Sequence, residues 1–108
     1  MTNPFREALE GGEFVITVEM IPGRGAFEVN QEKEYEAMKE MYATGRVHAV
    51  SITDNPSGNA AISSPAVGRR FQKDGIPSLV HYTCKDRSRN LMQGELYEMQ
   101  HDGLENLL

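Results

Sequence analysis

The chain has 108 residues, which is enough for one small domain with a core of modest size. Its hydrophobic content of 39% and charged content of 25% are ordinary for a soluble globular protein. The formal net charge is −5 and the basic residues are scattered, which argues against a nucleic-acid partner and against an anionic membrane surface, since both favour clustered Lys and Arg.

Cysteine usage and hydropathy indicate the compartment. Cys84 is the only cysteine, so no intrachain disulfide can form, which fits a reducing environment. The first twelve residues lack the apolar core of a signal peptide. No apolar run approaches the roughly 20 residues that span a bilayer. We therefore expect a cytoplasmic protein with no membrane partner.

The first quarter of the chain predicts a helix and a strand. Asn3 can cap a helix that has Pro4 in its first turn and that ends at Gly11 and Gly12. Residues 14–20, FVITVEM, are rich in Val and Ile and predict the first strand. This strand runs into a turn that contains two glycines and a proline.

A second helix and a second strand follow. Residues 29–44 are helical in pattern, with Asn30 as the predicted cap and an apolar stripe on one face. Residues 47–53 form an apolar, β-branched run, and residues 54–59 are nearly all turn formers. The pattern predicts a buried strand whose carboxyl end delivers Thr53, Asp54 and Asn55 into a polar loop.

The last part of the chain repeats this arrangement. Ser64 and Pro65 predict the start of a helix that ends at Gly75. Residues 77–83 predict a third strand, and Ser88 caps a helix that ends at Gly103. Residues 106–108 look like the first step of a fourth strand.

The spacing of these elements predicts the fold class. The predicted strands start at residues 14, 47, 77 and 106, about 30 residues apart, which is the size of a βα unit. Alternating strands and helices with apolar strands predict an α/β fold with a parallel sheet, in a single domain over residues 1–108. A (β/α)8 barrel takes roughly 250 residues, so we expect a partial TIM barrel of about three to four βα units. Further strands or another chain would complete it; a free-standing three-layer fold is the less favoured alternative.

Four stretches together resemble the methylenetetrahydrofolate reductase family, in the family's order and at similar separations. They are VEMIPGR at residues 18–24, VSITDN at 50–55, VHYTCKDR at 80–87 and GLENLL at 103–108. The resemblance implies a (β/α)8 barrel that binds FAD and reduces 5,10-methylenetetrahydrofolate to 5-methyltetrahydrofolate in one-carbon and methionine metabolism. It also implies that this chain is the N-terminal part of the barrel. The chain departs from the family at Gly23, where the family has a second proline, and it ends before the family's Arg/Ser-Gly-Asp segment.

Glu19 is the one carboxylate inside an apolar strand. Burial in the mouth of a barrel favours the protonated form of a carboxyl group, which suits a general acid. In the resemblance Glu19 matches the catalytic acid, which helps to open the five-membered ring of the folate before hydride transfer from reduced flavin. The alternative is a strand-end glutamate in a salt bridge, for example to Arg24.

The resemblance also implies cofactor-binding residues at the ends of the other strands. Thr53 matches a residue that hydrogen-bonds the flavin ring system, and His81 matches a flavin-contacting histidine. Asp54 and Asn55 occupy loop positions that touch FAD in relatives. The alternatives are a Thr that satisfies its local backbone, a plain turn, and a core histidine bonded to a neighbouring backbone group. No Cys or His pair has metal-ligand spacing, so we expect no metal.

Two functions remain open from the sequence. The favoured one is a flavin-dependent enzyme whose partners are the folate substrate, NAD(P)H or another electron donor, and a second copy or another chain that completes the barrel. The alternative is a non-catalytic truncated paralogue or subunit that acts as a structural partner. We expect this chain alone to be inactive.

Overall fold

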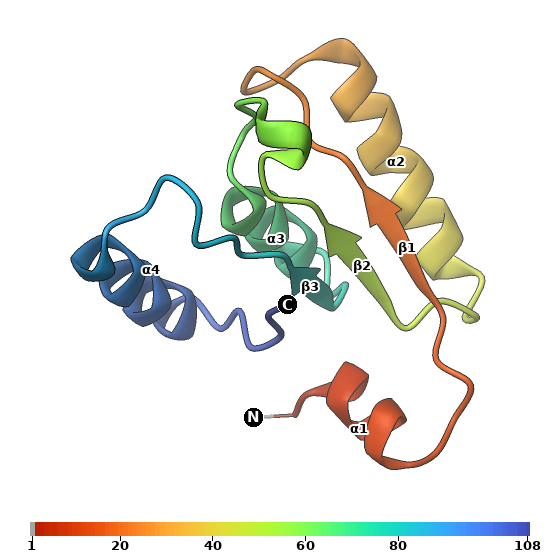
Figure 1. Cartoon of the computed structure of the whole chain (residues 1–108). Coiled ribbons are helices and arrows are strands. Elements are labelled where there is room, and N and C mark those ends of the chain that lie inside the picture. Colours follow the sequence, from red (N-terminus) through yellow and green to blue (C-terminus); the bar gives the residue numbers. More distant parts are fainter. Residues whose placement is uncertain (1) are drawn as a thin grey trace.

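A computed structural model describes residues 2–108 and shows an α/β fold with one parallel sheet (Figure 1). The strands lie in the order β1-β2-β3 and are Thr17–Met20, Ala49–Ile52 and Ser78–Val80. The helices are α1 (Pro4–Glu10), α2 (Val29–Ala43), α3 (Ser64–Lys73) and α4 (Arg89–His101), with a short 3-10 helix, η1 (Pro56–Gly58). The predicted parallel pairing of neighbouring strands is confirmed.

Two of the predicted helix caps are shifted. The side chain of Glu28, not that of Asn30, caps α2 by accepting the backbone N–H of Asn30 at 3.1 Å. Ser63, not Ser64, caps α3. Ser64 is completely buried and its hydroxyl donates to the carbonyl oxygen of His81 at 2.6 Å. In both cases two polar residues close together in the sequence could cap the helix, and the sequence pattern alone does not indicate which of them does.

β1 is shorter than predicted because regular pairing with β2 stops at its amino end, although the carbonyl of Ile16 still accepts the backbone N–H of His48 at 2.8 Å. The backbone N–H of Ile16 donates to the ring Nδ1 of His48 at 3.0 Å instead of to a strand carbonyl. Regular pairing begins only at Thr17, opposite Ala49. Phe14, the predicted first residue of the strand, is 88% exposed.

The end of the chain takes the position predicted for a fourth strand. Leu107 forms a parallel bridge with Val80. The N–H of Val80 donates to the carbonyl of Asn106, and the N–H of Leu108 donates to the carbonyl of Val80, each at 2.9 Å. This segment therefore continues the strand order next to β3.

One face of the sheet packs against the helices. Met20, Ile52 and Val80 align in register across the three strands and are at most 1% exposed. They contact core side chains from α2, α3 and α4, namely Tyr35, Met38, Val67, Phe71 and Met99. Side chains alternate along a strand, so the neighbouring aligned residues Glu19, Ser51 and Leu79 lie on the opposite face of the sheet.

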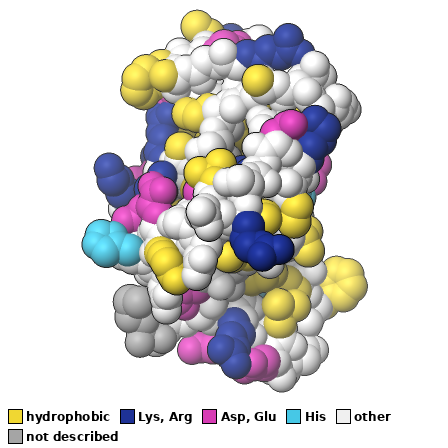
Figure 2. All heavy atoms as spheres, turned by 60° about the vertical axis from the view of Figure 1, so that its left-hand side comes forward, with side chains coloured by type: hydrophobic (Ala, Val, Ile, Leu, Met, Phe, Trp, Pro, Cys, Tyr) yellow, Lys and Arg dark blue, Asp and Glu magenta, His cyan; other side chains and the backbone are white. Residues whose placement is uncertain are grey.

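The surface carries charges of both signs. Figure 2 shows Lys and Arg side chains separated by acidic and uncharged ones, with several small hydrophobic patches between them. Within residues 2–108, no helix combines the length and the apolar character needed to cross a membrane.

Candidate functional site

Glu19, Thr53 and His81 come together at one end and on one face of the sheet. The N–H of Thr53 donates to the carbonyl of Met20 at 3.2 Å, and the N–H of His81 donates to the carbonyl of Ile52 at 3.0 Å. Thr53 and His81 are thus the first residues after β2 and β3. By alternation their side chains share the face of Glu19, away from the core. The carboxyl ends of parallel strands are where barrel enzymes carry their chemistry.

The side chain of Glu19 is exposed and free of ion pairs. Among the salt bridges found in residues 2–108, none involves Glu19, so the alternative of a pair with Arg24 is not formed. The carboxylate is therefore available to a ligand that approaches this face.

The hydroxyl of Thr53 is a buried polar group with no partner. Its Oγ1 is shielded from solvent, yet it makes no hydrogen bond to any residue that the structure describes. A buried hydroxyl without a protein partner is costly, so Thr53 Oγ1 is a candidate to bond a ligand. The alternative reading, in which Thr53 satisfies its local backbone, is not what the structure shows.

His81 is held by a hydroxyl from the neighbouring strand. Ser51 Oγ lies 2.5 Å from the ring Nε2 of His81. Ser51 is one register position from the end of β2, opposite Glu19. Ser51 was not among the predicted site residues; the available signal was a serine two residues before Thr53, and so on the same face of the strand.

Asp54 is engaged in a buried ion pair. One of its carboxylate oxygens accepts from Arg87 Nη1 at 2.7 Å and from the backbone N–H of Thr83 at 2.9 Å. The side chains of Asp54 and Arg87 are 2% and 10% exposed. The guanidinium of Arg87 also lies 4.1 Å from the ring centre of Tyr82. Asp54 therefore ties the loop after β2 to the loop after β3.

The electrostatics of this cluster follow from its hydrogen bonds and its burial. The hydrogen bonds that Arg87 donates to Asp54, aided by the charge of that carboxylate, raise the pKa of Arg87 above its ordinary value. Burial raises the pKa of the Tyr82 hydroxyl, which has no hydrogen-bond partner among residues 2–108. The cluster is thus an ion pair beside a buried phenol, which suits a structural tie between loops.

Asn55 shapes the loop after β2. Its backbone is in the left-handed region, with φ of 45°, and its Oδ1 accepts the N–H of Ala61 at 3.0 Å. Asn tolerates this conformation better than most residues. Asp54 and Asn55 thus have the intramolecular contacts expected of a structured turn, and their contacts with FAD stay a prediction.

The comparisons with known proteins fit this arrangement. A family model described as methylenetetrahydrofolate reductase matches residues 4–108. The chain belongs to the methylenetetrahydrofolate reductase family. The search of curated proteins found no match. The resemblance carried by the four sequence stretches is therefore confirmed, and membership of the family indicates an oxidoreductase.

In this family member, Thr53, Asp54 and His81 line an open pocket of about 280 Å³, whereas Glu19 and Asn55 are not among its lining residues. Its lining is formed by Thr53, Asp54, Pro56, His81, Tyr82, Thr83 and Leu108. The pocket is therefore built from the loops after β2 and β3 and from the end of the chain.

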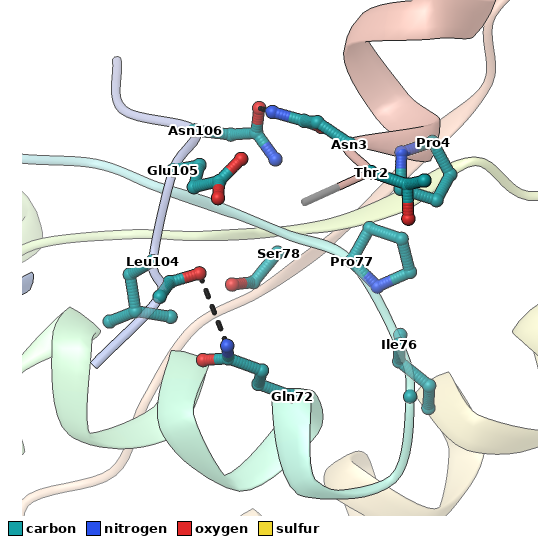
Figure 3. A pocket seen from close by; sticks show the side chains of 12 residues that line it. Thr2, Asn3, Pro4, Gln72, Ile76, Pro77, Ser78, Leu104, Glu105 and Asn106 are labelled. Atoms are coloured by element: carbon teal, nitrogen blue, oxygen red, sulfur yellow. Dashed lines mark hydrogen bonds between the residues drawn. The ribbon is translucent and has the colours of Figure 1, made fainter. Parts of the chain in front are cut away.

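A second pocket, of about 210 Å³, lies at the amino end of β3 (Figure 3). Asn3 donates to Asn106 across it at 2.8 Å, and Gln72 donates to the carbonyl of Gly103 at 3.1 Å. These contacts join α1, α3 and the end of the chain. In (β/α)8 barrels, residues at the amino ends of the strands serve stability rather than chemistry, and we assign no site to this pocket.

Proposed function

We propose that this chain contributes the acid and part of the flavin pocket for the reduction of 5,10-methylenetetrahydrofolate to 5-methyltetrahydrofolate, with NAD(P)H or another electron donor. The observation that carries the proposal is the convergence of Glu19, Thr53 and His81. Thr53 and His81 directly follow β2 and β3, and Glu19 is the penultimate residue of β1, all on the face turned away from the helices. Membership of the reductase family supports the same chemistry.

The strand order favours a barrel over a doubly wound sheet. In a doubly wound sheet the order reverses and helices cover both faces. Here the order is consecutive, residues 106–108 extend it beside β3, and α2, α3 and α4 all pack on the same face. We propose that further strands, from a longer polypeptide or from another chain, close this sheet into a (β/α)8 barrel.

The residues present fit FAD as the cofactor. The buried hydroxyl of Thr53 lacks a partner, and a hydroxyl can donate to or accept from the polar edge of a flavin. His81 adds a ring nitrogen on the same face. When bound, FAD would supply the hydride that the folate receives. Thr53 and His81 would hold it, and the Asp54–Arg87 pair would fix the two loops that carry them.

Glu19 would act on the folate rather than on the cofactor. Ring opening of the substrate leaves a nitrogen that gains a proton, and a carboxyl group at the mouth of the barrel can donate it. The free carboxylate of Glu19 is positioned for this role on β1. Cover from the remaining strands would exclude water and favour the protonated form of the carboxyl group.

The test is Glu19→Gln in the complete, flavin-loaded barrel. Gln keeps the shape and hydrogen bonding of Glu but has no proton to transfer, so folate reduction should fall by about 10²–10⁴-fold. Reduction of the flavin by its electron donor needs no proton from Glu19 and should change far less. Stopped-flow absorbance of the flavin measures the two half-reactions separately.

Glu40→Gln on α2 is the matched control, because Glu40 is also exposed but lies on a helix away from the strand ends. It should leave both half-reactions unchanged. Equal loss in both half-reactions of Glu19→Gln would mean that Glu19 supports the fold or positions the flavin. A wild-type protein that binds flavin but reduces no folate would favour the alternative of a non-catalytic structural subunit.

A further inference from the structure

The backbone of His81 is fixed on both sides. Its N–H donates to the carbonyl of Ile52 at 3.0 Å, and its carbonyl accepts from the buried hydroxyl of Ser64 at 2.6 Å. One ring nitrogen, Nε2, contacts Ser51 Oγ at 2.5 Å. The other ring nitrogen, Nδ1, makes no hydrogen bond with the residues that the structure describes. His81 is therefore held in place with one nitrogen left over for a ligand.

The hydroxyl of Ser51 determines which nitrogen carries the proton. Ser51 is 7% exposed, and across residues 2–108 its hydroxyl has no hydrogen-bond partner other than His81. A buried O–H that fails to donate loses a hydrogen bond. Among residues 2–108 the one acceptor that the hydroxyl contacts is Nε2, so donation from Ser51 to Nε2 is the arrangement that satisfies this hydroxyl within the protein. A neutral imidazole that accepts at Nε2 carries its hydrogen on Nδ1.

We propose that Ser51 is a positioning residue that fixes His81 as the Nδ1–H tautomer. The ring then presents an N–H donor to an acceptor atom of the ligand on this face. The identity of that ligand as a flavin, whose ring carries carbonyl oxygens and unprotonated nitrogens, rests on the proposed function. In a neutral histidine, the hydrogen-bond partner of one ring nitrogen determines whether the other ring nitrogen carries the proton.

The same chain contains an internal reference with the opposite tautomer. The Nδ1 of His48 accepts the backbone N–H of Ile16 at 3.0 Å. A backbone N–H can only donate, so neutral His48 carries its hydrogen on Nε2, which faces Glu13 at 3.1 Å. The two histidines should therefore give opposite patterns in one spectrum.

The experiment is long-range proton–nitrogen correlation NMR of the full chain labelled with nitrogen-15 at histidine, recorded at alkaline pH without flavin. We expect His81 protonated on Nδ1 and His48 on Nε2. In Ser51→Ala the preference of His81 should relax toward the mixture of free histidine, while His48 stays unchanged. Ser51→Thr keeps a hydroxyl and should restore the Nδ1–H form.

Ser78→Ala is the matched control. Ser78 is also 7% exposed in a neighbouring strand, but it faces the helices, close to Gly68. Its replacement should leave the tautomer of His81 unchanged, and dispersed amide spectra show that each variant is folded. His81 protonated on Nε2 in the wild type, or the same tautomer in Ser51→Ala, would overturn the proposal.

These outcomes are independent of the proposed function. The tautomer is measured without cofactor, so an unchanged tautomer removes the role of Ser51 and leaves the reductase proposal standing. If Ser51→Ala shifts the tautomer of His81 but the protein reduces no folate, the role of Ser51 stands and the reductase proposal fails.

Discussion

At the scale of single residues, the pair of Asp54 and Arg87 decides how the two site loops are held. The side chain of Asp54 is buried and that of Arg87 is nearly so, and Arg87 also donates to the carbonyl of Thr83 at 2.5 Å. A buried charge that loses its partner is strongly destabilising, whereas an exposed pair contributes little. The stability of the loops that carry Thr53 and His81 should therefore depend on this one pair.

We predict that Asp54→Asn lowers the free energy of unfolding by up to about 3–5 kcal/mol, because it removes the nearer counter-charge of the buried guanidinium of Arg87 and leaves only Glu95, whose carboxylate lies 3.4 Å from Arg87 Nε. Urea unfolding followed by circular dichroism measures the change. Glu10→Gln is the control: it breaks the pair with Arg6, in which the side chains are 71% and 63% exposed, and should cost less than about 1 kcal/mol. Equal effects of the two substitutions would contradict the prediction.

The sequence predicted those site residues whose position follows from a strand end. Thr53 was selected because it closes a β-branched apolar run and Glu19 because it interrupts one, whereas His81, inside the predicted third strand, was selected from its match to the family. Ser51 and Arg87 were missed, since their partners lie 30 and 33 residues away in the sequence. No local pattern reports which of several polar residues meet across a sheet.

At the scale of elements, α3 and β3 approach each other at Gly68. A Cβ built on Gly68 would lie 3.0 Å from Val80 Cγ2, 3.2 Å from Ser78 Oγ and 3.3 Å from Leu104 Cδ2. Val80 is completely buried, so it has little room to move. Gly68 therefore sets the distance at which the helix packs on the strand next to His81.

We predict that Gly68→Ala is destabilising although alanine is the better helix former. Overpacking typically costs about 1–3 kcal/mol, which outweighs the roughly 0.5–1 kcal/mol gained by removing a glycine from a helix. Gly94 in α4 is exposed and has no atom within 4 Å of a built Cβ, so Gly94→Ala should gain that amount. Thermal unfolding of both variants tests the prediction, and stabilisation in both would contradict it.

The sequence predicted that these helices and strands exist and in which order, but not how far the strands extend. Residues 14–20 share one apolar pattern, yet only Thr17–Met20 form β1. The apolar sequence pattern reflects which side chains prefer an extended backbone. The hydrogen bonds between β1 and β2 depend instead on which backbone groups of the neighbouring strand lie within reach. The ring of His48 takes the N–H of Ile16 and so ends the ladder early.

At the scale of the whole molecule, the sheet is covered unequally. The radius of gyration of 13.8 Å is close to the value of about 13 Å expected for a compact domain of this length. The core nevertheless lies on one side of the sheet, between the strands and α2, α3 and α4 (Figure 1). The opposite face carries Glu19, which is exposed, and the pocket beside Thr53 and His81 is open.

We predict that the 108-residue chain alone binds FAD only weakly. Ligand sites usually bury about 70–90% of their ligand in pockets of roughly 300–1,000 Å³. The pocket beside Thr53 has about 280 Å³ and is open, so most of a dinucleotide as large as FAD would stay in water. The flavin should therefore separate from the purified chain on gel filtration, as followed by its visible absorbance. A yellow protein with one flavin per chain after this step would contradict the prediction, and would show that the ends of three strands are sufficient to hold the cofactor.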